Sequence, residues 1–480
     1  MAWHARAVTW NRREMLAGLG VGSASLLLAF GCGAPAKQVR LAPQVRNDVR
    51  TWLRDAVSRL VTVYPQVHVL AVSRTRTTAA IDILGTGVSR TRRDGVVFTV
   101  RDKSGVWREH ATAELSRDGV QAAARMLAPG SIKPADLVFP DPPPAPSDPV
   151  EVADDALRNR VGAIMRQDKS GSSRIVYAAA LIDIDDVTLW SIGPGMDLEH
   201  QTRRVRKRAT RAAWSGSRPS VSEVERGWVG DVDDQQLSEE DVTNASLNAM
   251  LLTTPGAFED GEQTIVLEPS VGATIIDAAV RGLLTSSAAR RPEVTRRLAL
   301  GAAVAAPQLT LIDDPRAPHA YGGFPFDDEG EPSARVVLLD QGKVAGRLAR
   351  ARRPGHIGAL APTPSHLQLM AGTTKRRDLV GDGWLLEGEL GAVFDPASDR
   401  LVVAVARARE LKGGGTTGRV YADVELVGAL TALLAAVTGI AEESETTVLR
   451  EDIGGEPMWR SIQAPWLRSR GMVRARRRAT

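Results

Sequence analysis

From residue 300 onward the sequence is a succession of short apolar runs separated by glycine-containing turns. Val336–Leu339, Trp384–Leu386 and Leu401–Val405 are examples of these runs. Apolar runs of about four to eight residues between turn signals are typical of β-strands, because helices usually need ten or more residues. We therefore expect the C-terminal part of the chain to be a largely antiparallel β domain.

The first 137 residues mix helices with strands. Apolar residues at helical spacing predict a helix over Val49–Leu60. Ser116 is a suitable N-cap for a second helix over Arg117–Leu127. Three or four strands are expected between them, at Val67–Val72, Thr78–Leu84, Val96–Val100 and Val106–His110. This region is predicted to be an α+β domain.

A proline-rich segment, Phe139–Pro149, follows with the sequence FPDPPPAPSDP and predicts a semi-rigid linker. The next hundred residues again alternate between helical and strand patterns. Helices are expected at Val152–Met165 and Asp241–Leu252, and strands at Arg174–Leu181, Val187–Ile192 and Thr264–Leu267, with a strand-end turn at Asp183–Asp186 and a late helix at Val427–Val437. We predict an α+β fold with a central α/β region.

The predicted domain order follows from these boundaries. It comprises a signal peptide at 1–32, an N-terminal α+β domain at 44–137, a linker at 138–150, a central domain at 151–255, a C-terminal domain at 256–465 and a basic tail at 466–480.

Charge and cysteine content exclude several classes of protein. The chain has 61 basic and 57 acidic residues, which gives a net charge of +4 and only a weak preference for acidic partners. Basic residues cluster at Arg203–Arg211 and Arg468–Arg478, without interleaved aromatic residues. We interpret these clusters as a solvated strand and a solvated tail, not as a nucleic-acid site. The single cysteine, Cys32, excludes a disulfide framework and a Cys-rich metal cluster.

The N-terminus has the features of an export signal. Arg12 and Arg13 form a basic pair before the short apolar run Met15–Gly31, which ends at Cys32. The arginine pair is typical of a twin-arginine signal, and the residues around Cys32 resemble a lipobox. The alternatives are a plain signal peptide or an uncleaved anchor with an incidental cysteine. We expect an exported protein, lipid-anchored through Cys32 to the periplasm-facing membrane.

Beyond residue 260, the order of features resembles the TldD/PmbA metallopeptidase family. A strand, a turn at Gly272 and a helix over Ile275–Leu284 come first. The later matching features are Asp313-Asp314-Pro315, Gly322-Gly323, Asp327-Asp328-Glu329-Gly330, Leu339-Asp340-Gln341-Gly342, Gly381 to Gly388 and Phe394-Asp395-Pro396. The resemblance covers roughly residues 45–460 as many weak matches rather than one sharp motif.

The resemblance also implies where a metal site would be. In active members, the helix after the glycine turn carries HExxxH, in which two histidines bind zinc and the glutamate acts on water. Ile276 and Arg281 stand at the histidine positions here, and Asp277 stands at the glutamate position. Isoleucine offers no lone pair and arginine is a permanent cation. The stretch Arg450–Met458, which corresponds to a cysteine ligand of the family, contains no cysteine.

We therefore expect neither a metal nor another cofactor, and we interpret the degenerate helix as structural. Its apolar residues would be core, and Arg281 would be solvated or would face a cleft. Asp277 as a surviving general base is the alternative.

Three other candidates carry weaker signals. His319, His356 and His366 are too far apart in sequence to form a local metal motif. The turn Gly413–Arg419 lacks the Lys-Ser/Thr ending of a phosphate-binding loop, so we interpret it as a flexible turn. Asp183, Asp185 and Asp186 lack the glycine and distal glutamate of a calcium loop.

The leading hypothesis is a non-catalytic TldD/PmbA-family protein. The resemblance implies that it would pair with a TldD-type catalytic subunit, or with itself as a dimer, and would bind unfolded or modified peptides. One alternative is an active hydrolase that uses other residues, such as Asp277 or the scattered histidines. The other is a lipid-anchored binding scaffold without an enzymatic partner.

Overall fold

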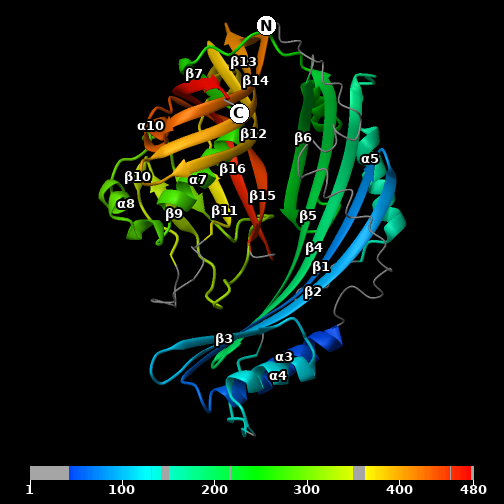
Figure 1. The fold of residues 1–480 in the computed structure, drawn as a ribbon, viewed down its shortest axis with the longest axis vertical. Helices are drawn as coiled ribbons and strands as arrows, with labels where there is room; N and C mark the ends of the chain where they lie inside the picture. The colour runs from blue at the N-terminus through cyan, green and yellow to red at the C-terminus, as the bar shows by residue number, and fades with distance from the viewer. Residues whose placement is uncertain are drawn as a thin grey trace, which may run out of the picture.

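The structure is a computed structural model of the chain (Figure 1). It describes residues 43–130, 132–141, 151–215, 218–349, 363–453 and 456–476. Several predictions concern residues outside these ranges, namely Arg12, Arg13 and Cys32 of the export signal, most of the proline-rich linker, His356, and the last residues of the tail. No helix in the described ranges combines the length and apolar character needed to span a bilayer.

The N-terminal sheet has six strands in the order β3-β2-β1-β4-β5-β6, and all neighbours are antiparallel. The strands are β1 (Gln66–Asp82), β2 (Gly85–Arg101), β3 (Trp107–Thr112), β4 (Ile175–Gly193), β5 (Met196–Ser215) and β6 (Arg218–Val229). Figure 1 shows α5 on the face turned away from the C-terminal domain, and α3 and α4 at the β3 end. The helices are α3 (Pro43–Leu60), α4 (Arg117–Leu127), α5 (Asp154–Arg166) and α6 (Glu239–Ala249).

Strands β1 and β4 pair along most of their length, so the segments on either side of the proline-rich linker contribute to one sheet. The sequence divides these segments into an N-terminal and a central domain, whereas the sheet joins them. The strand pieces predicted at Val67–Val72 and Thr78–Leu84 are one strand, β1. The turn predicted at Asp183–Asp186 is wrong, because β4 runs through these residues. Arginines on neighbouring strands neutralise the aspartates, which allows the strand to continue.

The C-terminal sheet has ten strands in the order β10-β9-β8-β11-β16-β14-β13-β12-β7, with β15 also paired to β16. It is largely antiparallel, with parallel pairs at β11–β16 and β12–β7. The strands are β7 (Gly261–Leu267), β8 (Leu311–Asp313), β9 (Val336–Asp340), β10 (Lys343–Val344), β11 (His366–Leu369), β12 (Gly383–Asp395), β13 (Arg400–Lys412), β14 (Gly415–Ala429), β15 (Gly439–Ile453) and β16 (Glu456–Ala475). The helices of this domain are α7 (Pro269–Leu283), η1 (Ala288–Arg290), α8 (Pro292–Arg297), α9 (Arg376–Leu379) and α10 (Leu430–Ala435).

Two predictions at the C-terminus are corrected here. The helix predicted at Val427–Val437 begins only at Leu430, because β14 continues to Ala429 and Leu426 pairs with Val403. A short apolar run is compatible with either structure. The segment predicted as a solvated tail is instead the second half of β16, where Leu467 and Val473 are buried.

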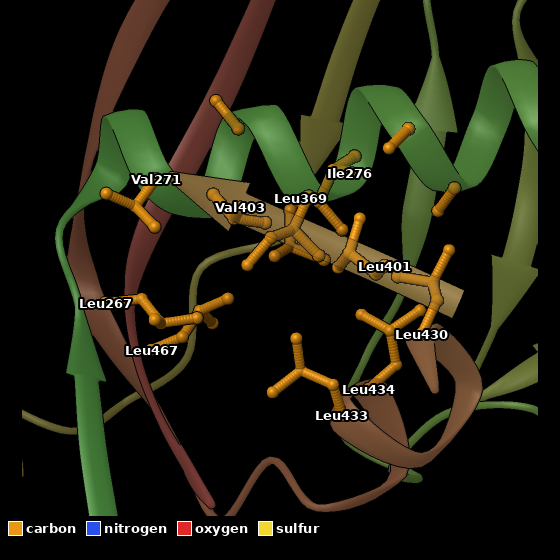
Figure 2. Packing of buried hydrophobic residues seen from close by; sticks show 14 of the residues in the cluster. Leu267, Val271, Ile276, Leu369, Leu401, Val403, Leu430, Leu433, Leu434 and Leu467 are labelled. Carbon is orange, nitrogen blue, oxygen red and sulfur yellow. The ribbon is translucent and has the colours of Figure 1, made fainter. Parts of the chain in front are cut away.

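Helix α7 packs across the C-terminal sheet and forms the centre of its core. Figure 2 shows Ile276 of α7 pointing toward Leu401 of β13, while Val271, nearer the start of the helix, lies above Leu267 and Leu467. Burying each side chain of this size contributes about 1.5–3 kcal/mol. The combination of helices with two mainly antiparallel sheets confirms the α+β fold class.

Trp459 of β16 joins the two sheets. The guanidinium groups of Arg74 and Arg204 each lie 4.6 Å from the centroid of its ring, and its indole N–H donates to Asp185. Arg204 donates to the backbone carbonyls of Tyr321 and Gly323, both at 2.8 Å. Burial lowers the pKa of Arg204 to about 10. The junction is therefore a packed, hydrogen-bonded contact and not a flexible linker.

Candidate functional site

Helix α7 has clear start and stop signals. Pro269 stands in its first turn, where its missing N–H costs no hydrogen bond, and Glu268 precedes it in extended conformation. The helix lies against β12 and β16, with β15 beside it. Ile275, Ile276, Ala279, Val280, Leu283 and Leu284 are all buried. The helix is thus held by apolar contacts on most of its surface.

Ile276, at the first histidine position of the family motif, is only 1% exposed and lies in the core cluster. In Figure 2 its side chain points from α7 toward the sheet. A hydrocarbon side chain in this position has no donor atom for a metal.

Asp277 is buried, and its carboxylate lies between two arginines. Its Oδ2 is 3.0 Å from Nε of Arg281, one helical turn further along α7, and 3.5 Å from Nη2 of Arg460 on β16. The Arg460 side chain is 6% exposed, whereas that of Arg281 is 45% exposed. We call these three residues the α7 charge cluster. Through Arg281 it reaches the surface.

Sequence reasoning missed Arg460. It is far from α7 in sequence, and no local motif identifies it. The only available signal was indirect, since a buried aspartate on an apolar helix needs a cation nearby.

Two glutamates lie beside α7, Glu389 near the charge cluster and Glu268 at the start of the helix. Burial raises the pKa of Glu389 and the negative charge of Asp277 adds to this, while hydrogen bonds from Thr274 and from the Gly391 backbone oppose it. Burial also raises the pKa of Glu268, whose carboxylate accepts a 2.7 Å hydrogen bond from the Gly388 N–H. The surroundings of α7 therefore make these two carboxyl groups easier to protonate.

The residues present do not fit the catalytic zinc that the family motif implies. Ile276 offers no ligand atom, and the Asp277 carboxylate already has two guanidinium groups beside it. A divalent ion about 4 Å from one guanidinium would be repelled by about 8 kcal/mol at an effective dielectric of about 20. Among the described residues, no group of three or more His, Cys, Asp or Glu side chains could hold a metal ion.

The described candidate histidines have separate structural partners. His319 faces the backbone carbonyl of Val229 at 3.1 Å, where the C-terminal domain meets β6. The buried Nδ1 of His366 lies 2.7 Å from the Ser461 hydroxyl, and burial lowers the pKa of this histidine. Neither contact is a metal-ligand arrangement.

The basic run Arg203–Arg211 is largely buried, which corrects the predicted solvated strand. Arg203 pairs with Asp186 and Asp231, and Arg211 pairs with Asp168. Burial lowers the pKa of Lys207 to about 8, and its ammonium group donates to the Gln235 carbonyl. These cations are paired inside the N-terminal domain, where they stabilise the sheet.

Comparison with known proteins finds a family match in the C-terminal part of the chain. Residues 260–475 match the model of the PmbA/TldA metallopeptidase C-terminal domain. A metalloprotease of Synechocystis is 24% identical over 192 residues, which is 40% of this chain and 41% of that protein. A metalloprotease of Archaeoglobus fulgidus is 27% identical over 101 residues, which is 21% of this chain and 24% of that protein. Each match spans less than half of the relative's own length. The metalloprotease activity of these relatives is therefore assigned to this chain only as a proposal.

Solved structures share the fold over nearly the whole chain. A Thermotoga maritima protein described as a candidate modulator of DNA gyrase has a TM-score of 0.69 and 14% identity, covering 89% of this chain and 100% of that one. TldE from Thermococcus kodakarensis has a TM-score of 0.64 and 15% identity, covering 90% and 100%. At these identities the likeness establishes the fold. The matched C-terminal domain, together with this shared fold, supports a TldD/PmbA-family member.

Proposed function

We propose that this chain is a non-catalytic TldD/PmbA-family protein that binds peptides, or pairs with a partner, within a metallopeptidase complex. The observation that carries the proposal is the α7 charge cluster. Asp277 stands at the catalytic glutamate position, between Arg281 and Arg460, and Ile276 replaces a zinc ligand. Guanidinium groups thus supply positive charge where relatives of this family use a metal.

Two strand edges support peptide binding. In the described residues, β6 pairs with β5 as its one neighbouring strand. β15 pairs with β16, and its other edge is bridged by Thr374 at Ala441, near the start of the strand. The two strands approach closely, since a Cβ atom on Gly227 of β6 would lie 2.7 Å from a methyl carbon of Val448 on β15. An extended peptide can pair with a strand edge through backbone hydrogen bonds, largely independent of its side chains. This recognition mode suits unfolded or modified peptides.

Metal analysis and a cleavage assay test the proposal together. The purified protein is expected to contain far less than one zinc per chain and to leave unfolded peptide substrates intact, with or without a chelator. A family member with an intact HExxxH motif, prepared in parallel, serves as the positive control. Stoichiometric zinc with chelator-sensitive cleavage by this chain alone would overturn the proposal.

The same assay separates the hydrolase alternative. Cleavage that survives the chelator and disappears in Asp277→Asn would assign Asp277 the role of a general base and reject the non-catalytic function. Under our proposal, wild type and variant are equally inactive.

Co-purification tests the partner. We expect this chain to form a complex either with a TldD-type catalytic subunit from the same cell or with itself. Size-exclusion chromatography with light scattering distinguishes these two assemblies. A protein that stays monomeric alone and in the presence of such a subunit would favour a binding scaffold without an enzymatic partner.

We further propose that the protein is exported and lipid-anchored through Cys32. Cells grown with a labelled fatty acid should incorporate the label into the wild type and not into Cys32→Ala. Arg12→Lys/Arg13→Lys should retain the precursor in the cytoplasm if the twin-arginine route is used. A protein that is exported but unlabelled would instead have a plain signal peptide.

A further inference from the structure

A basic groove lies between α9 and the turn that joins β13 to β14, apart from the α7 charge cluster. It has a volume of about 410 Å³ and is lined by Lys375, Arg376, Arg377, Val380, Gly414 and Glu443. The turn contains Gly413 and Gly414 with φ angles of 61° and 82°, backbone conformations that residues with a Cβ atom rarely adopt. The flexible turn predicted at Gly413–Arg419 is shorter than expected, because β14 begins at Gly415 and pairs with β13. Gly414 of the remaining turn lines the groove.

Arg376 is held in place by an aromatic ring. Its guanidinium carbon lies 3.7 Å from the ring centroid of Trp466 on β16, and Trp466 is only 4% exposed. The Arg376 backbone N–H also donates to the Glu443 carboxylate at 3.2 Å. Stacking fixes the plane of a guanidinium while its in-plane N–H groups can still bind an anion. Arg376 is therefore preorganised, unlike a freely rotating surface arginine.

The groove has more positive than negative charge. Among the described residues, the side chains of Lys375 and Arg376 form no ion pair, and Arg377 has only Asp378, at 3.6 Å and largely exposed. The lining holds three cations and one carboxylate, Glu443. The nearby Asp382 carboxylate accepts a hydrogen bond from the Gly413 N–H. An anion entering the groove would meet cations that have not already been neutralised by a strong ion pair.

We propose that this groove binds a phosphomonoester. A doubly charged phosphate matches the excess of cations better than a singly charged carboxylate. Guanidinium groups also bind phosphate oxygens through two parallel hydrogen bonds. The groove is larger than one phosphate group, so the ligand carries further atoms. Two sources share this chemistry, namely a phosphorylated small molecule and the headgroup of phosphatidic acid in a membrane.

Binding measurements on the full protein test the proposal. Glycerol 3-phosphate is titrated at low salt by calorimetry, and phosphatidylcholine vesicles with and without phosphatidic acid are tested by flotation. We expect saturable binding to at least one probe. Lys375→Gln/Arg376→Gln should weaken that binding by about tenfold or more, because two charge-assisted hydrogen-bond donors are lost. Binding to the small molecule or to vesicles alone identifies the source.

The matched control removes equal charge elsewhere. Arg290 and Arg296 are exposed on η1 and α8, so Arg290→Gln/Arg296→Gln should bind as tightly as wild type. Equal weakening in both double variants would indicate nonspecific attraction and overturn the proposal, as would no saturable binding to either probe. If the groove double variant does not fold, Lys375→Gln alone, at an exposed position, must still weaken binding.

Discussion

Asp183 of β4 and Asp277 of α7 are both buried aspartates that lie between two arginines, yet their surroundings differ. Asp183 accepts hydrogen bonds from Arg76, Arg206 and Thr78 across three neighbouring strands. Asp277 is paired along its own helix with Arg281, which is half exposed, and across to Arg460. The first cluster is part of an enclosed sheet, whereas the second reaches the surface through Arg281, on the helix that the resemblance aligns with the family's metal-binding motif. Similar local chemistry is thus enclosed in one region and partly exposed, through Arg281, in the other.

The largest expected change in the free energy of unfolding is at the cluster of Asp183, Arg76 and Arg206. Asp183→Ala leaves Arg76 and Arg206 without their shared carboxylate and should reduce the free energy of unfolding by about 3–5 kcal/mol. Urea denaturation measures this change. Asp155→Ala, which removes an exposed pair with Arg158, is the control and should cost less than about 1 kcal/mol. Similar effects of the two substitutions would show that the Asp183 cluster does not stabilise the sheet.

A smaller effect should distinguish the two arginines of the α7 charge cluster. Arg460→Ala removes a buried partner of Asp277 and should lower the free energy of unfolding by about 2 kcal/mol. Arg281→Ala removes a half-exposed partner within the same helix and should cost about 0.5 kcal/mol. Urea unfolding of the two variants compares them directly. A larger loss of stability for Arg281→Ala than for Arg460→Ala would show that the buried Arg460–Asp277 pair does not dominate the stability of the cluster.

Acid should act in opposite directions on the two regions. Burial alone would raise the pKa of Asp183, but the charges of Arg206 and Arg76 bring it well below the unfolded value of 3.8. Its stabilising contribution is therefore present above pH 3.8 and is lost as the pH falls toward the folded pKa. The pKa of Glu389 is raised above its unfolded value of 4.5, so its contribution is present below pH 4.5 and is lost as the pH rises through the folded pKa.

Hydrogen exchange, corrected for intrinsic rates, can follow the two regions separately. On acidification below pH 3.8, protection should fall in β1, β4 and β5 before it falls in α7. Asp183→Asn should remove this acid sensitivity from the N-terminal sheet. Simultaneous loss of protection in both regions would show that these carboxyl groups do not control their local stability.

The elements with local signals could be predicted from the sequence. Helix α4 has the predicted bounds, and Ser116 accepts the N-cap hydrogen bond from Gly119. Strands β1 and β4 were predicted as separate pieces, because Arg74, Asp183 and their charged neighbours interrupt the apolar pattern. These charges are neutralised by residues on other strands. A local reading of the sequence does not contain those partners.

In the candidate site, too, residues with a local sequence signal could be predicted and residues that depend on distant strands could not. The resemblance directed attention to Ile276, Asp277 and Arg281 on one helix, where the spacing is visible in the sequence. Arg460 and the stacking of Arg376 on Trp466 depend on contacts with β16. Such contacts become apparent only once the sheet order is known.

Strand β16 sits at the middle of the C-terminal sheet although it comes from the end of the chain. It pairs with β7, β11, β14 and β15. Because β16 follows these four strands in the chain, each of them has an unfilled edge during synthesis until β16 emerges from the ribosome. The N-terminal sheet has no such dependence on β16 for its strand pairing. A ribosome-bound chain could therefore complete the first sheet early, while the second would be exposed to aggregation until β16 is synthesised.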